Sequence, residues 1–302
     1  MKGYIVSDRV KVGLALLSTY TIWGSTYLGM NYALQSIPPL HLSAYRFLAA
    51  SVIMMLFMRW RGASFPSVRE LLGGMGVGVI LLGVGNGGVV LGLNYHIPTG
   101  LTALILASSP IWAAIFGGFW GLWPNRREVI GLIVGFLGVI VLRFDGQIQA
   151  APMGFIFLML AAMGWSLGTV LIPRVRQSPN AYMASGAQML GASISLFIAA
   201  TLTGEQVTQA VTTTSLWAFG YLLIFGSLVG FTAYSYLVPR VRPALAISSA
   251  YVNPMVAVLL GTMLNQESVS AYMLYALPLI IGGVLLMSFA KLKKQTVTEA
   301  VA

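Results

Sequence analysis

Aromatic and small polar side chains recur at helical spacing inside the apolar segments of this chain. Trp23, Thr26 and Tyr27 stand at positions i, i+3 and i+4, so a helix places them on one face. A second tryptophan, Trp165, is followed directly by Ser166. Such residues suit a zwitterionic or moderately apolar solute of amino-acid size, held by aromatic contact and a few neutral hydrogen bonds. The sequence therefore predicts a solute-binding cavity with aromatic walls.

Further neutral residues complete this predicted cavity. They are Asn86, Ser109, Trp112, Ser248, Tyr251 and Asn253. Ordinary packing or a place in the interfacial aromatic belt also explains a tryptophan or tyrosine in an apolar segment. Trp23 and Trp165 stand near the middle of their segments, which favours the cavity over the belt. For the serines and threonines, hydrogen bonds between helices explain the residue type as well as substrate contact does.

Arg46 is the one charged residue predicted to lie within a membrane-spanning segment. An arginine at the centre of a span costs about 2.5–3.5 kcal/mol on insertion scales, so it needs a carbonyl, water or a ligand carboxylate. The residue suits capture of an anionic group or a gate contact. A structural arginine that binds helix-end carbonyls explains it equally well. The matching place in the second half holds neutral Gln188, so any such role is asymmetric.

Proline and glycine residues predict places of movement and close packing. Pro110 and Pro254 occupy equivalent places in two predicted helices, and each permits a kink. We expect these prolines, together with Gly24, to act as gates or hinges, with a static kink as the equal alternative for the prolines. Small residues four apart predict close helix contacts. The pairs are Gly74/Gly78, Gly117/Gly121 and Gly131/Gly135.

Several kinds of chemistry are excluded by residue content. The chain has no cysteine, and we find no metal-ligand cluster, P-loop or nucleophile motif in the sequence. Residues 83–88 match G-x-G-x-x-G, but they lie inside an apolar segment with no preceding strand, so we reject a dinucleotide site. No carboxylate lies within a predicted span, which favours facilitated diffusion or exchange over proton antiport. We therefore expect no enzymatic activity, no cofactor and no metal ion.

The elements that must position these residues are membrane-spanning helices. Of the 302 residues, 58% are hydrophobic and 8% are charged, far fewer charges than in soluble domains. Spans need about 20 mostly apolar residues. Ten segments qualify: 12–33, 39–58, 71–92, 100–121, 128–144, 153–173, 181–203, 215–237, 244–264 and 270–290. The sequence thus predicts an all-α membrane protein, and its net charge of +10 reflects topology, with no nucleic acid as partner.

The distribution of basic residues predicts the orientation. With the N-terminus in the cytoplasm, nearly all of the 17 basic residues fall on the cytoplasmic side. These are Lys2, Arg9, Lys11, Arg59, Arg61, Arg69, Arg126, Arg127, Arg174, Arg176, Arg240, Arg242, Lys291, Lys293 and Lys294. Arg143 falls in an outer loop, and Arg46 falls within a span. We expect ten spans with both termini in the cytoplasm.

The chain repeats internally. The sequence GWS at 164–166 echoes WGS at 23–25, and the prolines at 110 and 254 lie in similar surroundings. Five helices per half is an odd number, so the second half must be inverted relative to the first. Two inverted halves around one cavity are typical of secondary transporters. We predict two repeats, residues 1–147 and 148–302, the second ending in a short polar tail.

The ordered motifs resemble those of the drug/metabolite transporter superfamily, in its EamA-type ten-helix members. They are IWGSTY at 22–27, YRFLAA at 45–50, VGNG at 84–87, AYVNP at 250–254 and LLG at 259–261. Glu128 and Glu267, each before the last helix of a half, also resemble that family. The resemblance covers nearly the whole chain and is greatest to the YedA-like bacterial inner-membrane branch. It implies ten helices, alternating access, and export of amino acids, related metabolites or drugs across a bacterial inner membrane.

The function expected from residues and resemblance together is export of a small organic solute, an amino acid or related metabolite. A broad-specificity drug exporter is the alternative, and a carboxylate facing the cavity would favour it. A lipid-acting membrane enzyme would need a clustered catalytic site, and a non-transporting scaffold would lack a cavity between the repeats. The expected partners are the solute and the lipid bilayer. The sequence leaves the oligomeric state open and is compatible with a monomer.

Overall fold

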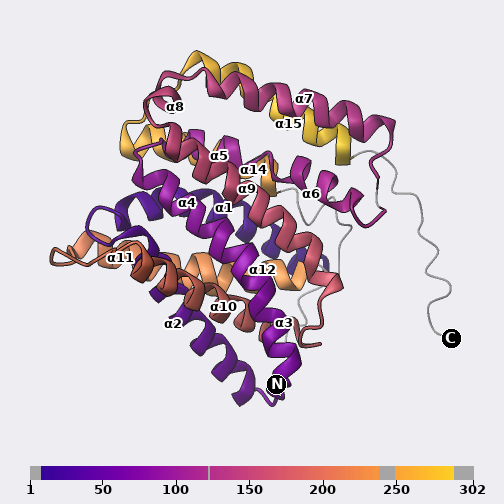
Figure 1. The fold of residues 1–302 in the computed structure, drawn as a ribbon, viewed down its shortest axis with the longest axis vertical. Helices are drawn as coiled ribbons and strands as arrows, with labels where there is room; N and C mark the ends of the chain where they lie inside the picture. Colours follow the sequence, from indigo (N-terminus) through magenta and orange to yellow (C-terminus); the bar gives the residue numbers. More distant parts are fainter. Residues whose placement is uncertain (1–7, 122, 238–248, 289–302) are drawn as a thin grey trace.

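The computed structural model describes residues 8–121, 123–237 and 249–288, and this part of the chain is helical throughout, without a strand. Figure 1 shows the helices as a layered bundle. In chain order they are α1 (Asp8–Ala33), α2 (Pro39–Trp60), α3 (Val68–Gly78), η1 (Val79–Val84), α4 (Gly85–Asn94), α5 (Thr99–Leu106), α6 (Ser109–Gly118), α7 (Arg126–Arg143), α8 (Gly146–Ala150), α9 (Pro152–Leu171), η2 (Ile172–Arg174), α10 (Ala181–Leu202), α11 (Thr213–Tyr221), η3 (Leu222–Val229), α12 (Gly230–Leu237), α14 (Ser249–Asn265) and α15 (Ala271–Ser288).

Helix is present in every segment that the sequence predicts to span the membrane. Among the described residues, 6 stretches are long and apolar enough to cross a bilayer by length and composition. They are Pro39–Trp60, Val68–Asn94, Thr99–Gly118, Pro152–Arg174, Ala181–Leu202 and Thr213–Tyr234. Val252–Asn265 and Ala271–Gly283 are shorter apolar helices. The number of ten crossings and the cytoplasmic position of both termini stay predictions.

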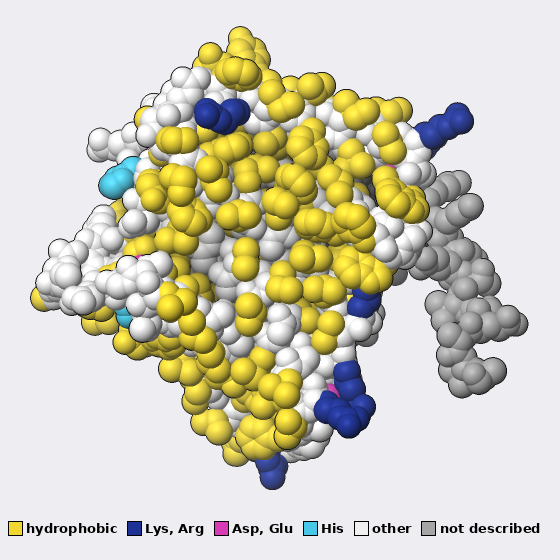
Figure 2. All heavy atoms as spheres, in the orientation of Figure 1, with side chains coloured by type: hydrophobic (Ala, Val, Ile, Leu, Met, Phe, Trp, Pro, Cys, Tyr) yellow, Lys and Arg dark blue, Asp and Glu magenta, His cyan; other side chains and the backbone are white. Residues whose placement is uncertain are grey.

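The outer surface of the bundle matches a bilayer. Leucine, isoleucine, valine and phenylalanine side chains are exposed along most helices, among them Leu56 at 58% and Ile133 at 58%. In Figure 2 hydrophobic side chains cover most of the face shown, while Lys and Arg lie near its edges. A soluble protein rarely exposes so large an apolar surface, whereas lipid tails accept it without cost.

Helices of the first half pack mainly against helices of the second. The pairs α2 with α10 and α7 with α15 are the most extensive, and Figure 1 shows α7 and α15 side by side at the top of the view. Helix α1 packs on α11 and α12, and the corresponding helix of the second half, α9, packs on η1 and α4. These contacts of α1 and α9 correspond to one another with the halves exchanged.

Glycines allow the closest of these contacts. A Cβ atom on Gly78 would lie 1.8 Å from the carbonyl oxygen of Gln188, so α3 and α10 touch through their backbones. A Cβ on Gly283 of α15 would lie 2.6 Å from both the Gly131 oxygen and the Gly135 nitrogen. These contacts confirm two of the predicted glycine pairs. The third prediction is wrong at Gly121, which has a φ of +79° and no neighbour within 4 Å, because it lies in the turn after α6.

The third helix of each half contains one π-helical segment in its middle. This segment is η1 in the first half and η3 in the second. A π-segment adds one residue to a turn and shifts the faces of the helix that follows it. The residues after η1 and those in and after η3 face the same internal space, described next. Neither segment is predicted from the sequence, and each contains one glycine, Gly83 in η1 and Gly226 in η3.

Candidate solute-binding site

A central cavity of about 140 Å³ lies between the two halves. Its walls come from α1, α2, η1, α4, α5, α6, α9, η3, α12 and α14, so both halves contribute. The volume is enough for several water molecules or a small solute, since a water needs at least about 10–15 Å³ by this measure. The wall is mostly apolar, with a small number of hydrogen-bonding groups, as is usual for a small-molecule site.

An aromatic cluster forms one wall of the cavity. The ring of Trp23 lies 5.9 Å from that of Trp165, nearly perpendicular to it, and 5.8 Å from that of Phe231. The Trp23 indole nitrogen donates to the Gly226 carbonyl oxygen at 3.4 Å. Gly230 leaves room for this indole, because a Cβ there would lie 2.4 Å from its nitrogen. Edge-to-face contacts of this kind fix the tryptophans in place.

Arg46 and Asn86 form the main polar group in the wall. Arg46 is only 3% exposed, and its Nη2 donates to the Asn86 side-chain oxygen at 2.6 Å. The Ser43 hydroxyl donates to the same oxygen at 3.1 Å. The Arg46 guanidinium also lies over the ring of Phe47, with its carbon 4.5 Å from the ring centroid. The partner of Arg46 is therefore an amide side chain, a choice that the sequence alone did not offer.

The predicted kink at Pro110 is a complete break between α5 and α6. Proline at this position leaves the Leu106 carbonyl without its helical donor, and the Ser109 hydroxyl donates to that carbonyl at 2.6 Å instead. The Ser166 hydroxyl donates to the Ser109 carbonyl, also at 2.6 Å. The break is thus satisfied by serine side chains, and one of them comes from the other half.

Helix α14 differs from its counterpart, because it continues through Pro254 without a break. Asn253 lines the cavity, and its amide nitrogen, in the orientation that satisfies its neighbours, donates to the Ser249 and Tyr20 carbonyls at 3.1 and 3.3 Å. Gly24 of α1 allows close approach to α14, since a Cβ there would lie 2.6 Å from that of Val256. Pro110 and Pro254, equivalent in the sequence, are therefore not equivalent in the fold.

The structure brings most of the predicted site residues to one cavity. Those that line it are Trp23, Thr26, Tyr27, Arg46, Asn86, Ser109, Trp165, Asn253 and Pro254. Trp112 lies outside the lining and packs against Phe116 and Phe136. Ser166 is 1% exposed and is used by backbone carbonyls. Ser248 and the side chain of Tyr251 lie outside the described residues.

A second cavity of about 390 Å³ adjoins the first. Trp165 and Phe231 line both, so these two side chains separate the cavities. The second cavity reaches the connection between α9 and α10, where Gln177, Ser178 and other residues line it. This is the end of the bundle that carries Arg174 and Arg176, and we call it the basic end. The opposite end carries Asp145, Glu205 and Glu267 in its loops, and we call it the acidic end.

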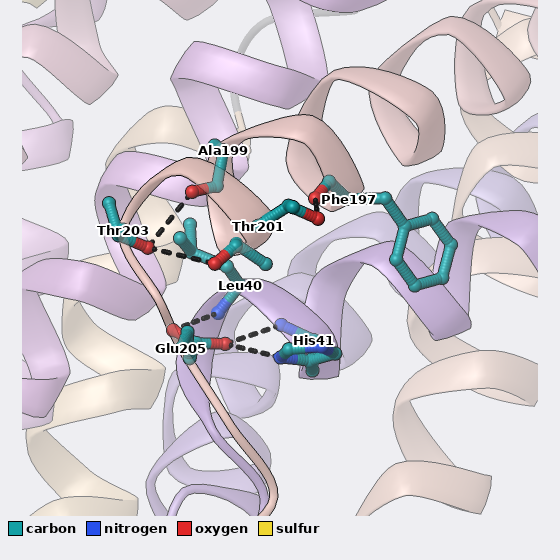
Figure 3. Close-up of polar contacts among 8 residues, drawn as sticks. Leu40, His41, Phe197, Ala199, Thr201, Thr203 and Glu205 are labelled. Atoms are coloured by element: carbon teal, nitrogen blue, oxygen red, sulfur yellow. Dashed lines mark hydrogen bonds and ion pairs between the residues drawn. The ribbon is translucent and has the colours of Figure 1, made fainter.

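Hydrogen bonds join the two halves at the acidic end. The Glu205 carboxylate accepts from the backbone N–H of Leu40 at 3.2 Å, and from the N–H and Nδ1 of His41, both at 2.8 Å. Figure 3 shows Glu205 pointing at the start of α2, which lacks a side-chain cap of its own. The Thr212 backbone N–H donates to the Ser36 hydroxyl at 3.0 Å. We call these contacts between residues 32–41 and 205–215 the seam.

Two further carboxylates join the halves at this end. Glu267 accepts from the Thr99 hydroxyl at 2.9 Å and from the Gly100 N–H at 3.3 Å, at the start of α5. Asp145, at the end of α7, accepts from the Ser270 hydroxyl, just before α15. Glu128, by contrast, caps its own helix in a capping box with Asn125. Sequence reasoning placed these acids in loops but did not foresee that three of them connect the halves.

The helical fold, the apolar outer surface and the internal cavity define a multi-pass membrane protein with a solute-sized site between its halves. The chain belongs to the EamA-like transporter family, whose model matches residues 11–144 and 152–289. It is a transporter of the inner membrane, as the resemblance in the sequence implied. The two matched ranges correspond to the two halves of the fold.

Comparison with individual proteins supports this assignment. The chain is 38% identical to the uncharacterized inner membrane transporter YedA of Escherichia coli (strain K12), over 92% of this chain and 90% of that protein. It is 22% identical to a probable amino-acid metabolite efflux pump of the same strain, over 92% and 95%. A solved crystal structure 18% identical in sequence covers 91% of this chain and 96% of its own, with a TM-score of 0.62. This last likeness is one of fold alone.

Proposed function

We propose that this transporter exports small organic solutes, amino acids or related metabolites, by alternating access around the central cavity. The proposed frame is the one expected from the sequence: ten spans in two inverted repeats, with both termini and the basic end in the cytoplasm. A relative named as a probable amino-acid metabolite efflux pump supports the substrate class. No enzymatic role is part of this proposal.

The observation that carries the proposal is the difference between the two ends. At the acidic end the seam holds the α1–α2 connection against the α10–α11 connection. The inverted repeat makes the α9–α10 and α2–α3 connections their counterparts at the basic end. Among the described residues we find no hydrogen bond between residues 61–67 and 172–180, and the larger cavity reaches the α9–α10 connection instead. The start of α3 does touch this connection, since a Cβ on Gly73 would lie 2.0 Å from the Arg176 carbonyl oxygen. One end held by hydrogen bonds between the halves and the other reached by a cavity is an arrangement that fits one state of an alternating-access cycle.

The cavities also favour facilitated diffusion or exchange. Among the described residues that line either cavity there is no aspartate, glutamate or histidine. A proton-coupled carrier usually has a titratable group along the solute pathway. The same feature disfavours the alternative of a broad exporter of cationic drugs, which a carboxylate in the cavity would have supported.

Solute counterflow in proteoliposomes tests the proposal. Labelled amino acids are offered to vesicles preloaded with unlabelled solute, without an ion gradient. We expect saturable exchange that is abolished by Trp23→Ala and retained by Trp217→Ala, the same change at a side chain 78% exposed on the outer surface. Equal exchange by both variants would exclude the central cavity as the route. Exchange that appears only under a pH gradient would show that transport is coupled to protons.

A further inference from the structure

The charge of the central cavity is unbalanced. Arg46 is the one charged side chain among the described residues that line it. Arg46 as a whole is 3% exposed, and the other described residues of the cavity wall are apolar or neutral. A charge in such surroundings is costly without a charged or strongly polar partner, because little solvent is present to stabilise it. The protein maintains a positive field in the cavity at that cost.

The hydrogen bonds of Arg46 are also incomplete. Its Nε is buried and has no partner among the described residues. The one side-chain acceptor that the guanidinium contacts in the described part of the chain is the Asn86 oxygen, which is neutral and also accepts from the Ser43 hydroxyl. A guanidinium has five N–H donors arranged to match a carboxylate in a bidentate pair. A structural arginine would instead have its donors satisfied by helix-end carbonyls, which is not what the contacts show.

Asn86 holds Arg46 in position without neutralising it. An aspartate has nearly the same shape as asparagine and would form an internal ion pair at the 2.6 Å separation of these groups. With asparagine, the positive charge remains available to a solute. In the second half the position that corresponds to Arg46 holds Gln188. This residue is neutral, and its side-chain nitrogen donates to the Gln177 side-chain oxygen at 2.8 Å. Among the described residues the positive group in the wall is therefore present in one half alone.

We infer that Arg46 is the receptor for a carboxylate group of the transported solute. The inference rests on the proposed transport function and narrows its substrate class to carboxylates and zwitterions. Solutes that carry only a positive charge are repelled by the same guanidinium. The ammonium group of a zwitterion has no carboxylate to meet among the described lining residues. It is left with carbonyl oxygens and the faces of Trp23 and Trp165, which attract cations weakly.

Three compounds with one ring and different charges test this assignment. They are L-phenylalanine, 3-phenylpropionate, which has the carboxylate alone, and 2-phenylethylamine, which has the ammonium alone. Binding of each to the purified full-length transporter is measured by isothermal titration, and counterflow of each is measured in proteoliposomes. We expect the two carboxylates to bind at least about tenfold more tightly than the amine, the factor given by one hydrogen bond between charged groups.

Two variants separate the charge of Arg46 from its place in the fold. Arg46→Gln removes the charge, and we expect the preference for carboxylates over the amine to fall about tenfold or more. Asn86→Asp keeps Arg46 but pairs it internally, so we expect carboxylate binding to be lost while the folded protein is retained. Arg143→Gln removes an exposed arginine on the outer surface and serves as the matched control. It should leave the preference unchanged.

The outcomes distinguish this inference from the proposed function. Equal binding of the amine and the carboxylates by the unmodified protein would overturn the inference, as would an unchanged preference in both Arg46→Gln and Asn86→Asp. Failure of the carboxylates to bind at all would do the same. Carboxylate-selective binding without any counterflow would support the role of Arg46 and overturn the transport proposal instead.

Discussion

Glu205 is expected to hold the acidic end closed, and its removal should open that end. The Glu205→Ala change takes away the acceptor of three hydrogen bonds and leaves the N–H groups of Leu40 and His41 without a partner. The side chains of Glu205 and His41 are largely buried, with exposed fractions of 14% and 17%. Hydrogen bonds to a charged group contribute about 1.5–3 kcal/mol each, and water replaces part of the loss here, so we take about 2–3 kcal/mol in total.

This free energy sets the size of the effect. Opening the acidic end separates the α1–α2 connection from the α10–α11 connection, so the Glu205 contacts stabilise the closed arrangement alone. A loss of about 2–3 kcal/mol shifts the population toward the open arrangement by roughly 30- to 160-fold. Glu205→Gln keeps one acceptor oxygen without the charge, and its effect should be intermediate.

Cysteine labelling measures this population directly. The chain has no cysteine of its own, so a single cysteine at Ser227, which lines the central cavity, reports without background. A membrane-impermeant maleimide is added from the side of the acidic end. We expect Glu205→Ala to raise the labelling rate by the factor given above. Glu128→Ala, which removes an exposed cap within a single helix, is the control and should leave the rate unchanged. Equal labelling rates for the Glu205→Ala variant and for the protein that retains Glu205 would refute the reasoning.

Two other changes test the separation of the cavities and the packing of the halves. Trp165→Ala removes one of the two side chains between the cavities of about 140 and 390 Å³, so counterflow should accept larger solutes and lose affinity for small ones; an unchanged size limit would argue against Trp165 as the separating residue. Gly78→Ala places a Cβ 1.8 Å from the Gln188 oxygen and should destabilise the fold by about 3 kcal/mol or more, seen as a lower melting temperature. The control is Gly76→Ala on the same helix, where an added Cβ would have nothing within 4 Å, and this change should be neutral or stabilising by up to about 1 kcal/mol. Equal changes of melting temperature in the two variants would show that α3 and α10 do not touch at Gly78.

Much of the fold was readable because membrane helices are specified by composition. Among the described residues, long apolar runs between turn signals predicted the long helices to within a few residues, except where two helices meet in one span. The short helix α8 (Gly146–Ala150) was not predicted. The break between α5 and α6 was expected as a kink at Pro110. Its extent depends on Ser109 and Ser166, which satisfy the freed carbonyls from two different helices. That three-dimensional arrangement cannot be read from one proline.

Helical spacing in the sequence predicted the cavity residues of the regular helix α1 correctly. It failed for Ser166 of α9 and for Phe231 after η3. Trp23, Thr26 and Tyr27 line the cavity together because α1 is regular. Ser166 follows Trp165 by one residue, which turns it about 100° around α9, away from the cavity and onto the backbone of α6. Phe231 was missed because it follows η3, where the π-segment shifts the helical face by a residue. Glycine-rich stretches in the third helix of each half were the available signal.

The two halves share one arrangement of helices but differ in their polar residues. In the predicted inverted repeat, matched helix pairs would let either end close in the same way. The polar residues differ: Arg46 faces Asn86 in one half while Gln188 bonds Gln177 in the other, and the carboxylates that join the halves gather at one end. A symmetric set of contacts would stabilise both ends equally and would leave the cavity without a preferred charge. We therefore expect the residues that set substrate charge to lie among the sequence differences between the predicted repeats, and those that set the fold to lie among the similarities.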